Sequence, residues 1–255
     1  MKIVVLVKQV PDTFGERKLD TTTGLLDRDA SEPIIDEINE RALEAALQQK
    51  DADKSVEVVA LSMGPSSATD ALRKALAMGA DRAIHVLDDS LAGADVARTT
   101  AVIGAAVASE GFDLVVAGNE STDGRGGVLA SSLAETLGVA ALTSIGELTV
   151  DGTSVSGVRA TEYGTVTARA DLPAVVSATE RAPEGRFPNF KGIMTAKKKP
   201  LATVTLAELG VGDSGARSTV VSVAERPART AGVKIVDDGT AATQLAEFLA
   251  SNRLI

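Results

Sequence analysis

A glycine-rich run in the middle of the chain has the composition of a phosphate-binding loop. Residues 118–127 read GNESTDGRGG, with four glycines among ten residues, and follow the apolar run Phe112–Ala117. Backbone N–H groups in such a loop, and the partial positive charge of a following helix N-terminus, favour a phosphate, to which Arg125 adds a charge-assisted donor. No glycine stands at position 129 and no Gly-Lys-Ser/Thr follows, so the run is neither GxGxxG nor Walker A. It predicts a phosphate site; the alternative is a glycine-rich connection without a ligand.

Other polar residues have simpler explanations. We expect Asp123 to cap the following helix or to hold a ribose hydroxyl, because a carboxylate repels phosphate. His85 lies in an apolar strand pattern, which indicates that it packs in the core. Because it is the one histidine of the sequence, the spacing of residues indicates no Ser-His-Asp triad. Asp36 stands where a helix N-cap is expected. The basic run 197–199 is either a solvated stretch or the rim of a docking surface for an acidic partner.

Composition excludes several classes of function. The 255 residues carry a net charge of −9, one His, no Cys, no Trp, five Phe and one Tyr. Proteins that coat nucleic acid carry the opposite charge, and base-stacking platforms need several exposed aromatic residues. Without cysteine, and with one histidine, the chain offers no disulfide, thiolate nucleophile or Cys- or His-rich metal site. We therefore expect no nucleic-acid partner, no metal and no hydrolytic machinery.

From the sequence we expect neither a membrane span nor a secretory leader. The apolar run Ile3–Val7 meets Lys8 at once, which is too short for a secretory leader. No stretch approaches the roughly 18 apolar residues of a membrane span. Together with the absence of cysteine, this predicts a cytoplasmic protein that does not insert into a membrane.

Alternating strand and helix patterns position the glycine-rich run. The β-branched or apolar runs that predict strands are Lys2–Val7, Ser55–Ser62, Arg82–Leu87 and Phe112–Ala117. Helical patterns separate them, so the first 145 residues predict an α/β fold with a doubly wound, mostly parallel, Rossmann-like sheet. Hairpin signals after residue 147 predict an antiparallel extension of that sheet. We expect a nucleotide-binding domain over 1–209, with an aperiodic loop at 181–200, and a C-terminal arm over 210–255.

Ligands in a doubly wound sheet bind beyond the carboxyl ends of the strands. The loops after Val7, Ser62 and Ala117 are therefore the candidate binding loops. A free-standing adenine-nucleotide-binding module or enzyme with this architecture fits these observations as well as a subunit of a complex does.

Several segments together resemble one family, the β subunit of electron transfer flavoprotein. They follow the family's order and spacing from Met1 to the C-terminus. The segments are KIVVLVKQVPDT (2–13), NERALEAAL (39–47), VVALSMGP (58–65), AGNESTDGRGGVLASSLAE (117–135), RFPNFKGIM (186–194) and AKKK (196–199).

The resemblance implies a heterodimer whose α subunit holds most of a redox FAD, while the β subunit buries a structural AMP. Positions carried over from the family's AMP site are Leu6, Asp36, Glu37, Ile38, Asn39, Met63, Asn119, Glu120, Ser121, Thr122, Asp123, Gly124, Arg125, Gly126, Gly127, Val128 and Leu129. Bifurcating members hold a second FAD at this place. The loop differs from many bacterial relatives at Arg125, Gly126 and Gly127, so a second FAD is the alternative ligand.

The resemblance also implies an electron carrier rather than an enzyme with its own substrate. Flavin dehydrogenases, such as the acyl-CoA dehydrogenases of fatty acid oxidation, would pass single electrons to the FAD, and a membrane quinone oxidoreductase would accept them. Thr13 and Phe14 would contact the flavin edge. Within a docking loop at 184–194, the dehydrogenase would contact Phe187, Phe190, Ile193 and Met194.

Overall fold

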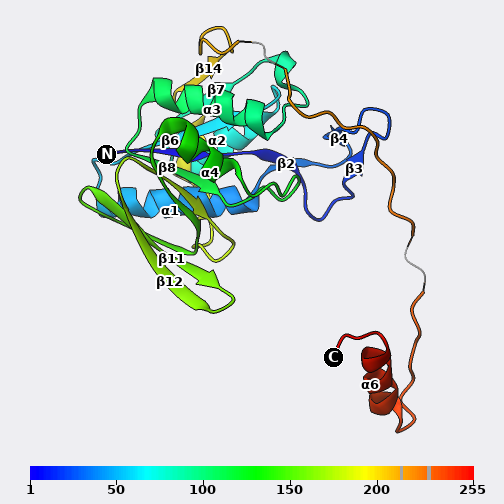
Figure 1. The fold of residues 1–255 in the computed structure, drawn as a ribbon. Helices are drawn as coiled ribbons and strands as arrows, with labels where there is room; N and C mark the ends of the chain where they lie inside the picture. The colour runs from blue at the N-terminus through cyan, green and yellow to red at the C-terminus, as the bar shows by residue number, and fades with distance from the viewer. Residues whose placement is uncertain (213–214, 229–230) are drawn as a thin grey trace. The chain divides into compact units, whose positions relative to one another are not determined.

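The computed structural model describes residues 1–212, 215–228 and 231–255, which form two compact units, Met1–Val221 and Ser222–Ile255. The first unit is built on a central sheet with helices on both faces (Figure 1). It extends beyond residue 209, where the sequence placed the domain boundary. The second unit contains one helix, α6 (Ala241–Ser251), among its described residues.

The central sheet has seven strands, all parallel to their neighbours. Their spatial order is β14 (Leu201–Val204), β7 (Arg82–Val86), β6 (Glu57–Met63), β1 (Lys2–Leu6), β8 (Leu114–Gly118), β13 (Ala174–Ala178) and β9 (Ala140–Ile145). The chain builds outward from β1 to β7 on one side and then crosses to β8 on the other. This confirms the doubly wound α/β fold.

The β-branched sequence of β1 reflects burial on both faces of the sheet. Ile3 and Val5 belong to a core with helices α1 (Glu37–Ala52) and α2 (Ala68–Met78). Val4 and Leu6 belong to a second core with α3 (Val96–Glu110) and α4 (Leu129–Leu137). Because successive side chains of a strand point to opposite faces, only a continuous apolar run fills both cores.

The antiparallel strands form a sheet of their own, separate from the parallel one. This sheet has the order β10 (Glu147–Asp151), β11 (Ser154–Thr161), β12 (Gly164–Asp171). The next strand, β13, returns to the central sheet between β8 and β9. Every residue of β13 is buried, whereas β12 is mostly exposed, so β13 suits the interior of a two-sided sheet and β12 a free edge.

Shorter elements complete the first unit. Strands β3 (Lys18–Leu19) and β4 (Leu26–Asp27) form a hairpin, and β2 (Gln9–Pro11) pairs with β5 (Pro33–Ile35). A 3₁₀ turn, η1, spans Asp89–Leu91.

The segment 181–200, expected to lack regular structure, contains the helix α5 (Phe190–Ala196). The Asn189 side chain caps it by accepting a hydrogen bond from the Gly192 N–H at 2.8 Å. Two turns are too short to show a helical period in the sequence. The strand β14 that follows pairs with β7 and was not predicted either.

Candidate functional site

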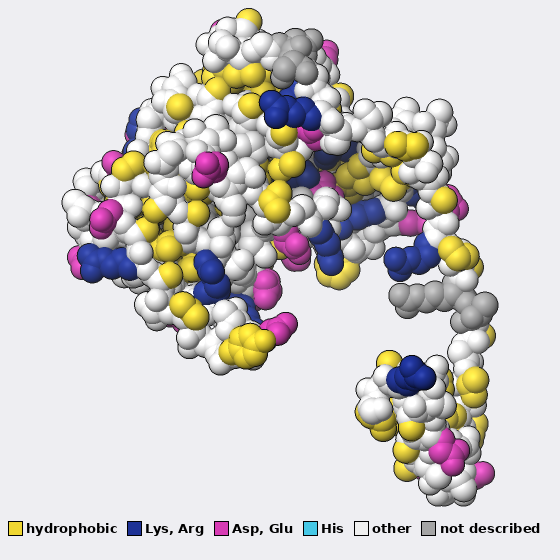
Figure 2. All heavy atoms as spheres, in the orientation of Figure 1, with side chains coloured by type: hydrophobic (Ala, Val, Ile, Leu, Met, Phe, Trp, Pro, Cys, Tyr) yellow, Lys and Arg dark blue, Asp and Glu magenta, His cyan; other side chains and the backbone are white. Residues whose placement is uncertain are grey.

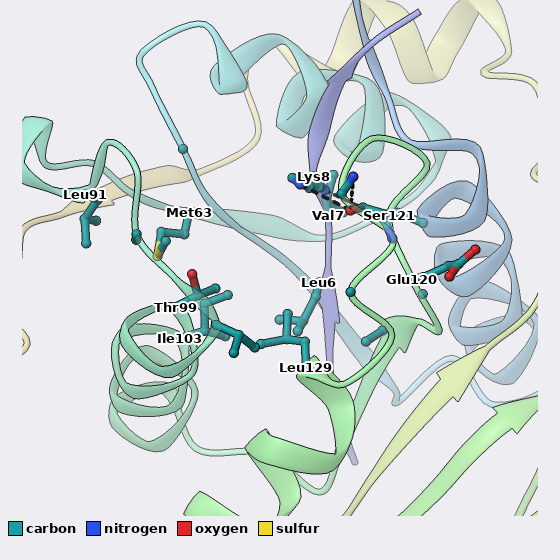
Figure 3. A pocket seen from close by; sticks show the side chains of 18 of the residues that line it. Leu6, Val7, Lys8, Met63, Leu91, Thr99, Ile103, Glu120, Ser121 and Leu129 are labelled. Atoms are coloured by element: carbon teal, nitrogen blue, oxygen red, sulfur yellow. Dashed lines mark hydrogen bonds between the residues drawn. The ribbon is translucent and has the colours of Figure 1, made fainter. Parts of the chain in front are cut away.

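A cleft of about 750 Å³ opens at the carboxyl ends of β1, β6 and β8 (Figure 3). Strand β1 lies between β6 and β8, where the winding of the sheet reverses direction. At such a point the loops that follow neighbouring strands run to opposite sides of the sheet, which creates a crevice between them. In Figure 2 a hollow beside the β3–β4 hairpin has hydrophobic and basic side chains around it.

One wall of the cleft is apolar. Leu6, Met63, Ile103 and Leu129 line it, and Figure 3 shows their side chains gathered on the same side, with Leu91 nearby. They come from the ends of two strands, β1 and β6, and from two helices of one face, α3 and α4, so the sheet topology brings them together. An apolar wall of this kind suits a flat aromatic ring such as a nucleobase.

The opposite part of the cleft is formed by backbone. Gly124, Gly126 and Gly127 line it, and a Cβ built on Gly126 or Gly127 would meet no atom within 4 Å. Gly127 has φ +67°, a backbone conformation that favours glycine. Among the described residues, no side chain caps the first turn of α4. Its N–H groups therefore remain available to an anion.

Lys8 and Asp123 form an ion pair at the glycine-rich loop. Lys8 Nζ lies 2.7 Å from Asp123 Oδ1 and 3.2 Å from Ser121 Oγ (Figure 3 shows Lys8 beside Ser121). Burial tends to raise the pKa of Asp123. The hydrogen bonds from Lys8 and Ser121, together with the positive charge of Lys8, outweigh this effect and hold the pKa of Asp123 below its usual value. Asp123 is thus an ionised partner of Lys8, and Lys8 is a cation that lines the cleft.

A buried carboxylate ties the glycine-rich loop to α1. Asp36 caps α1 by accepting a hydrogen bond from the Ile38 N–H at 2.9 Å, as the sequence predicts. Its other oxygen accepts bonds from the N–H and hydroxyl of Thr122, at 2.6 and 2.8 Å. Arg17 donates to the carbonyl and hydroxyl of the same threonine. Asp36 and Thr122 therefore support the loop from behind.

The structure divides the residues expected at the AMP site into two groups. Those that line the cleft are Leu6, Asn39, Met63, Asn119, Glu120, Ser121, Gly124, Gly126, Gly127, Val128 and Leu129. Those outside its lining are Asp36, Glu37, Ile38, Thr122, Asp123 and Arg125. Asp36 and Thr122 are buried behind the loop, while Glu37 and Arg125 are exposed. The expected flavin contacts, Thr13 and Phe14, are exposed as well.

Sequence reasoning missed two parts of the cleft. Lys8 is the second residue after β1, and the segment 88–96 after β7 supplies Leu91 and further lining residues. The rule that ligands bind beyond strand ends also covers the strand that ends near Leu87, and applying it there predicts this second wall.

Two other groups turn out to be structural. His85 is buried, with Nε2 3.0 Å from the Gly64 carbonyl and Nδ1 3.3 Å from the Thr69 hydroxyl, which confirms packing. Lys199 donates to the carbonyls of Leu76 and Ala80 at the end of α2, so it does not belong to a docking rim. Over the described residues, no group of three or more His, Asp or Glu is placed to hold a metal.

The residues expected to dock a dehydrogenase lie on or beside α5. Phe190, Ile193 and Met194 are exposed at 80%, 51% and 59%, and Phe187 at 95%. On a helix, positions three and four apart share a face, so Phe190, Ile193 and Met194 form one apolar stripe. We call these three residues and Phe187 the α5 patch.

None of the helices in the described parts of the chain has the length and apolar character that crossing a membrane requires.

The family model and the relatives that match this chain agree with one another. Residues 23–209 match the model of the electron transfer flavoprotein domain. The electron transfer flavoprotein subunit beta of Mycobacterium tuberculosis (strain H37Rv) is 47% identical over 263 aligned residues, covering 99% of each chain. The corresponding subunit of Megasphaera elsdenii is 34% identical over the full length of both chains. The caffeyl-CoA reductase-Etf complex subunit CarD of Acetobacterium woodii is 32% identical over 83% of this chain and 80% of its own.

Proposed function

The chain belongs to the electron transfer flavoprotein family, as one of its β subunits, and we propose that it carries single electrons as half of an αβ heterodimer. In this proposal the α subunit holds most of the redox FAD, and this chain contributes part of the flavin surroundings at Thr13 and Phe14. It acts as a carrier and not as an enzyme with a substrate of its own.

We propose that the cleft at the switch point of the sheet holds AMP, and this cleft is the observation that carries the proposal. Its volume of about 750 Å³ lies within the roughly 300–1,000 Å³ of small-molecule sites. The wall containing Leu6, Met63 and Leu129 suits adenine, and the turn at Gly126 and Gly127 suits a phosphate. AMP supplies no electron chemistry, so its role here is structural.

The α5 patch supports the docking part of the proposal. A compact group of exposed apolar side chains beside basic residues fits an apolar pocket on another protein. We propose that flavin dehydrogenases, such as acyl-CoA dehydrogenases, dock here, and that a membrane quinone oxidoreductase takes the electrons onward. A cytoplasmic location is part of the same proposal and fits the absence of cysteine.

The experiment is to purify this chain alone and together with its α partner, and to record flavin absorbance. We expect the chain alone to be colourless and the complex to be yellow. Adding an acyl-CoA dehydrogenase with its acyl-CoA should then bleach the flavin of the complex. Bound flavin on this chain in the absence of α would contradict the proposed division of labour.

A further inference from the structure

Lys8 places an ammonium group beside the turn formed by Gly124, Gly126 and Gly127. It is the second residue after β1, lines the cleft, and its Nζ would lie 3.9 Å from a Cβ built on Gly124. The positions of Lys8 and Ser121 in Figure 3 show that this group sits at the polar side of the cleft, away from the apolar wall.

The hydrogen bonds of Lys8 leave it able to bind a ligand. An ammonium group has three N–H donors, and the bonds to Asp123 and Ser121 use two of them. The side chain of Lys8 is 39% exposed, whereas that of Asp123 is 3% exposed. A ligand in the cleft can therefore reach the cation, while the carboxylate that balances it is shielded by protein.

The charge balance limits how much negative charge the cleft can accept. The charge of Lys8 is already matched by Asp123, and Asp88 and Asp89 also line the cleft. The other cation in its lining, Arg28, is exposed and donates to the Gln9 carbonyl at 3.3 Å. Lys8 and the backbone N–H groups of the turn at Gly126 and Gly127 can together hold one phosphate group. Each further phosphate adds charge that the cleft does not compensate.

We propose that Lys8 is a phosphate-binding residue of this chain, and that its pairing with Asp123 makes the cleft select a nucleoside monophosphate over the di- and triphosphate. This inference rests on the proposed nucleotide site and adds to it a residue and a selectivity.

The test is titration calorimetry of the full-length chain, freed of bound nucleotide, with AMP, adenosine and ATP. Lys8→Met should weaken AMP binding about tenfold or more, since a charge-assisted bond is lost. It should leave adenosine binding unchanged, which also shows that the cleft is intact. Lys8→Arg should retain most of the AMP affinity. Equal AMP affinity in wild type and Lys8→Met, or a larger loss in Arg28→Met, would overturn the role of Lys8.

Asp123→Asn tests the selectivity. Removing the balancing carboxylate should strengthen ATP binding relative to AMP binding about tenfold. An unchanged ratio would overturn the role of Asp123 as the selecting charge. Failure of the proposed nucleotide site has a different signature, because the wild-type chain would then bind none of the three ligands.

Discussion

The carboxylate of Asp36 joins α1 to the glycine-rich loop. It is fully buried, caps α1, and accepts two hydrogen bonds from Thr122. We expect Asp36→Ala to lower the free energy of unfolding by about 2–4 kcal/mol, since it removes an N-cap and leaves buried donors without partners. Urea unfolding measures this loss.

Asp36→Asn is the matched control, because an amide oxygen can still cap the helix. It should cost less than half as much as the alanine variant. If alanine and asparagine are equally tolerated, Asp36 does not hold the loop.

Asp95 makes a pH-dependent connection within the first unit. It caps α3 through the Arg98 N–H at 2.9 Å and accepts bonds from the N–H groups of Arg217 and Ser218 at 2.7 and 2.9 Å. The Arg98 N–H, followed by those of Ser218 and Arg217, lowers the pKa of Asp95 from 3.8 to about 2.

A carboxyl whose pKa is lower in the folded state stabilises the fold above its unfolded pKa and loses that effect as pH falls. The wild-type chain should therefore melt at a higher temperature than Asp95→Asn at pH 7. The difference should shrink as the pH falls from about 4 to about 2. A difference that stays constant over this range would show that the charge of Asp95 does not matter.

The segment that carries the α5 patch is fastened at both ends. Before the patch, Arg186 contacts both carboxylate oxygens of Glu44 at 2.7 and 2.9 Å and Asp51 at 2.8 Å. At its end, Arg73 donates to the carbonyls of Ala196 and Lys199. The exposed side chains are thus presented on a fixed support, which reduces the entropy lost on docking.

Phe190→Ala tests the patch. An aromatic residue at the centre of an interface contributes about 2 kcal/mol or more, so we expect reduction of the complex by a dehydrogenase to slow about thirtyfold at sub-saturating carrier. Because Phe190 is exposed, the melting temperature and chemical reduction of the flavin should stay near wild type.

Tyr163→Ala is the control, since Tyr163 is an exposed aromatic residue in the turn between β11 and β12. It should leave the rate of reduction unchanged. A Phe190→Ala variant that melts much lower but docks normally would place Phe190 in the fold rather than the interface.

The strands of the central sheet could be predicted where burial on both faces forces continuous apolar runs, as in β1 and β8. The elements that were missed lack this constraint. Strand β14 is a partly exposed edge strand, and α5 is held by contacts with α2, including the close approach of Gly192 to the Ala77 carbonyl. Such tertiary contacts leave no periodic trace in the sequence.

For the whole molecule, the chain beyond Val221 forms a separate unit. Leu245 and Phe248 of α6 are about half exposed, and hydrophobic side chains are visible over this unit in Figure 2. We expect a chain ending at Val221 to fold and bind AMP like the full chain, but to bind the α subunit at least about tenfold more weakly, because this apolar surface is lost.

A chain ending at Gly210 is the comparison, because it also loses the segment that contacts Asp95. It should melt lower than the chain ending at Val221. Unchanged affinity of the shorter chains for α, measured by titration, would show that the second unit does not hold the partner.

The cleft could be located from the sequence because strand ends and a glycine-rich run mark it. The sequence could not show which side chains of these loops line the cleft and which lie outside its lining. Asp36, Thr122 and Asp123 lie close to lining residues in the sequence but are not part of the lining, and Lys8 lines the cleft with Asp123 and Ser121 as its hydrogen-bond partners. These roles depend on contacts between residues that are 86 to 115 positions apart along the chain.

The proposed function is tested most directly by counting nucleotides in an acid extract of the purified αβ complex. We expect one AMP and one FAD per heterodimer, with AMP lost when the turn at Gly126 and Gly127 is disrupted. Two FAD and no AMP per heterodimer would contradict the structural AMP and assign the cleft to a second flavin.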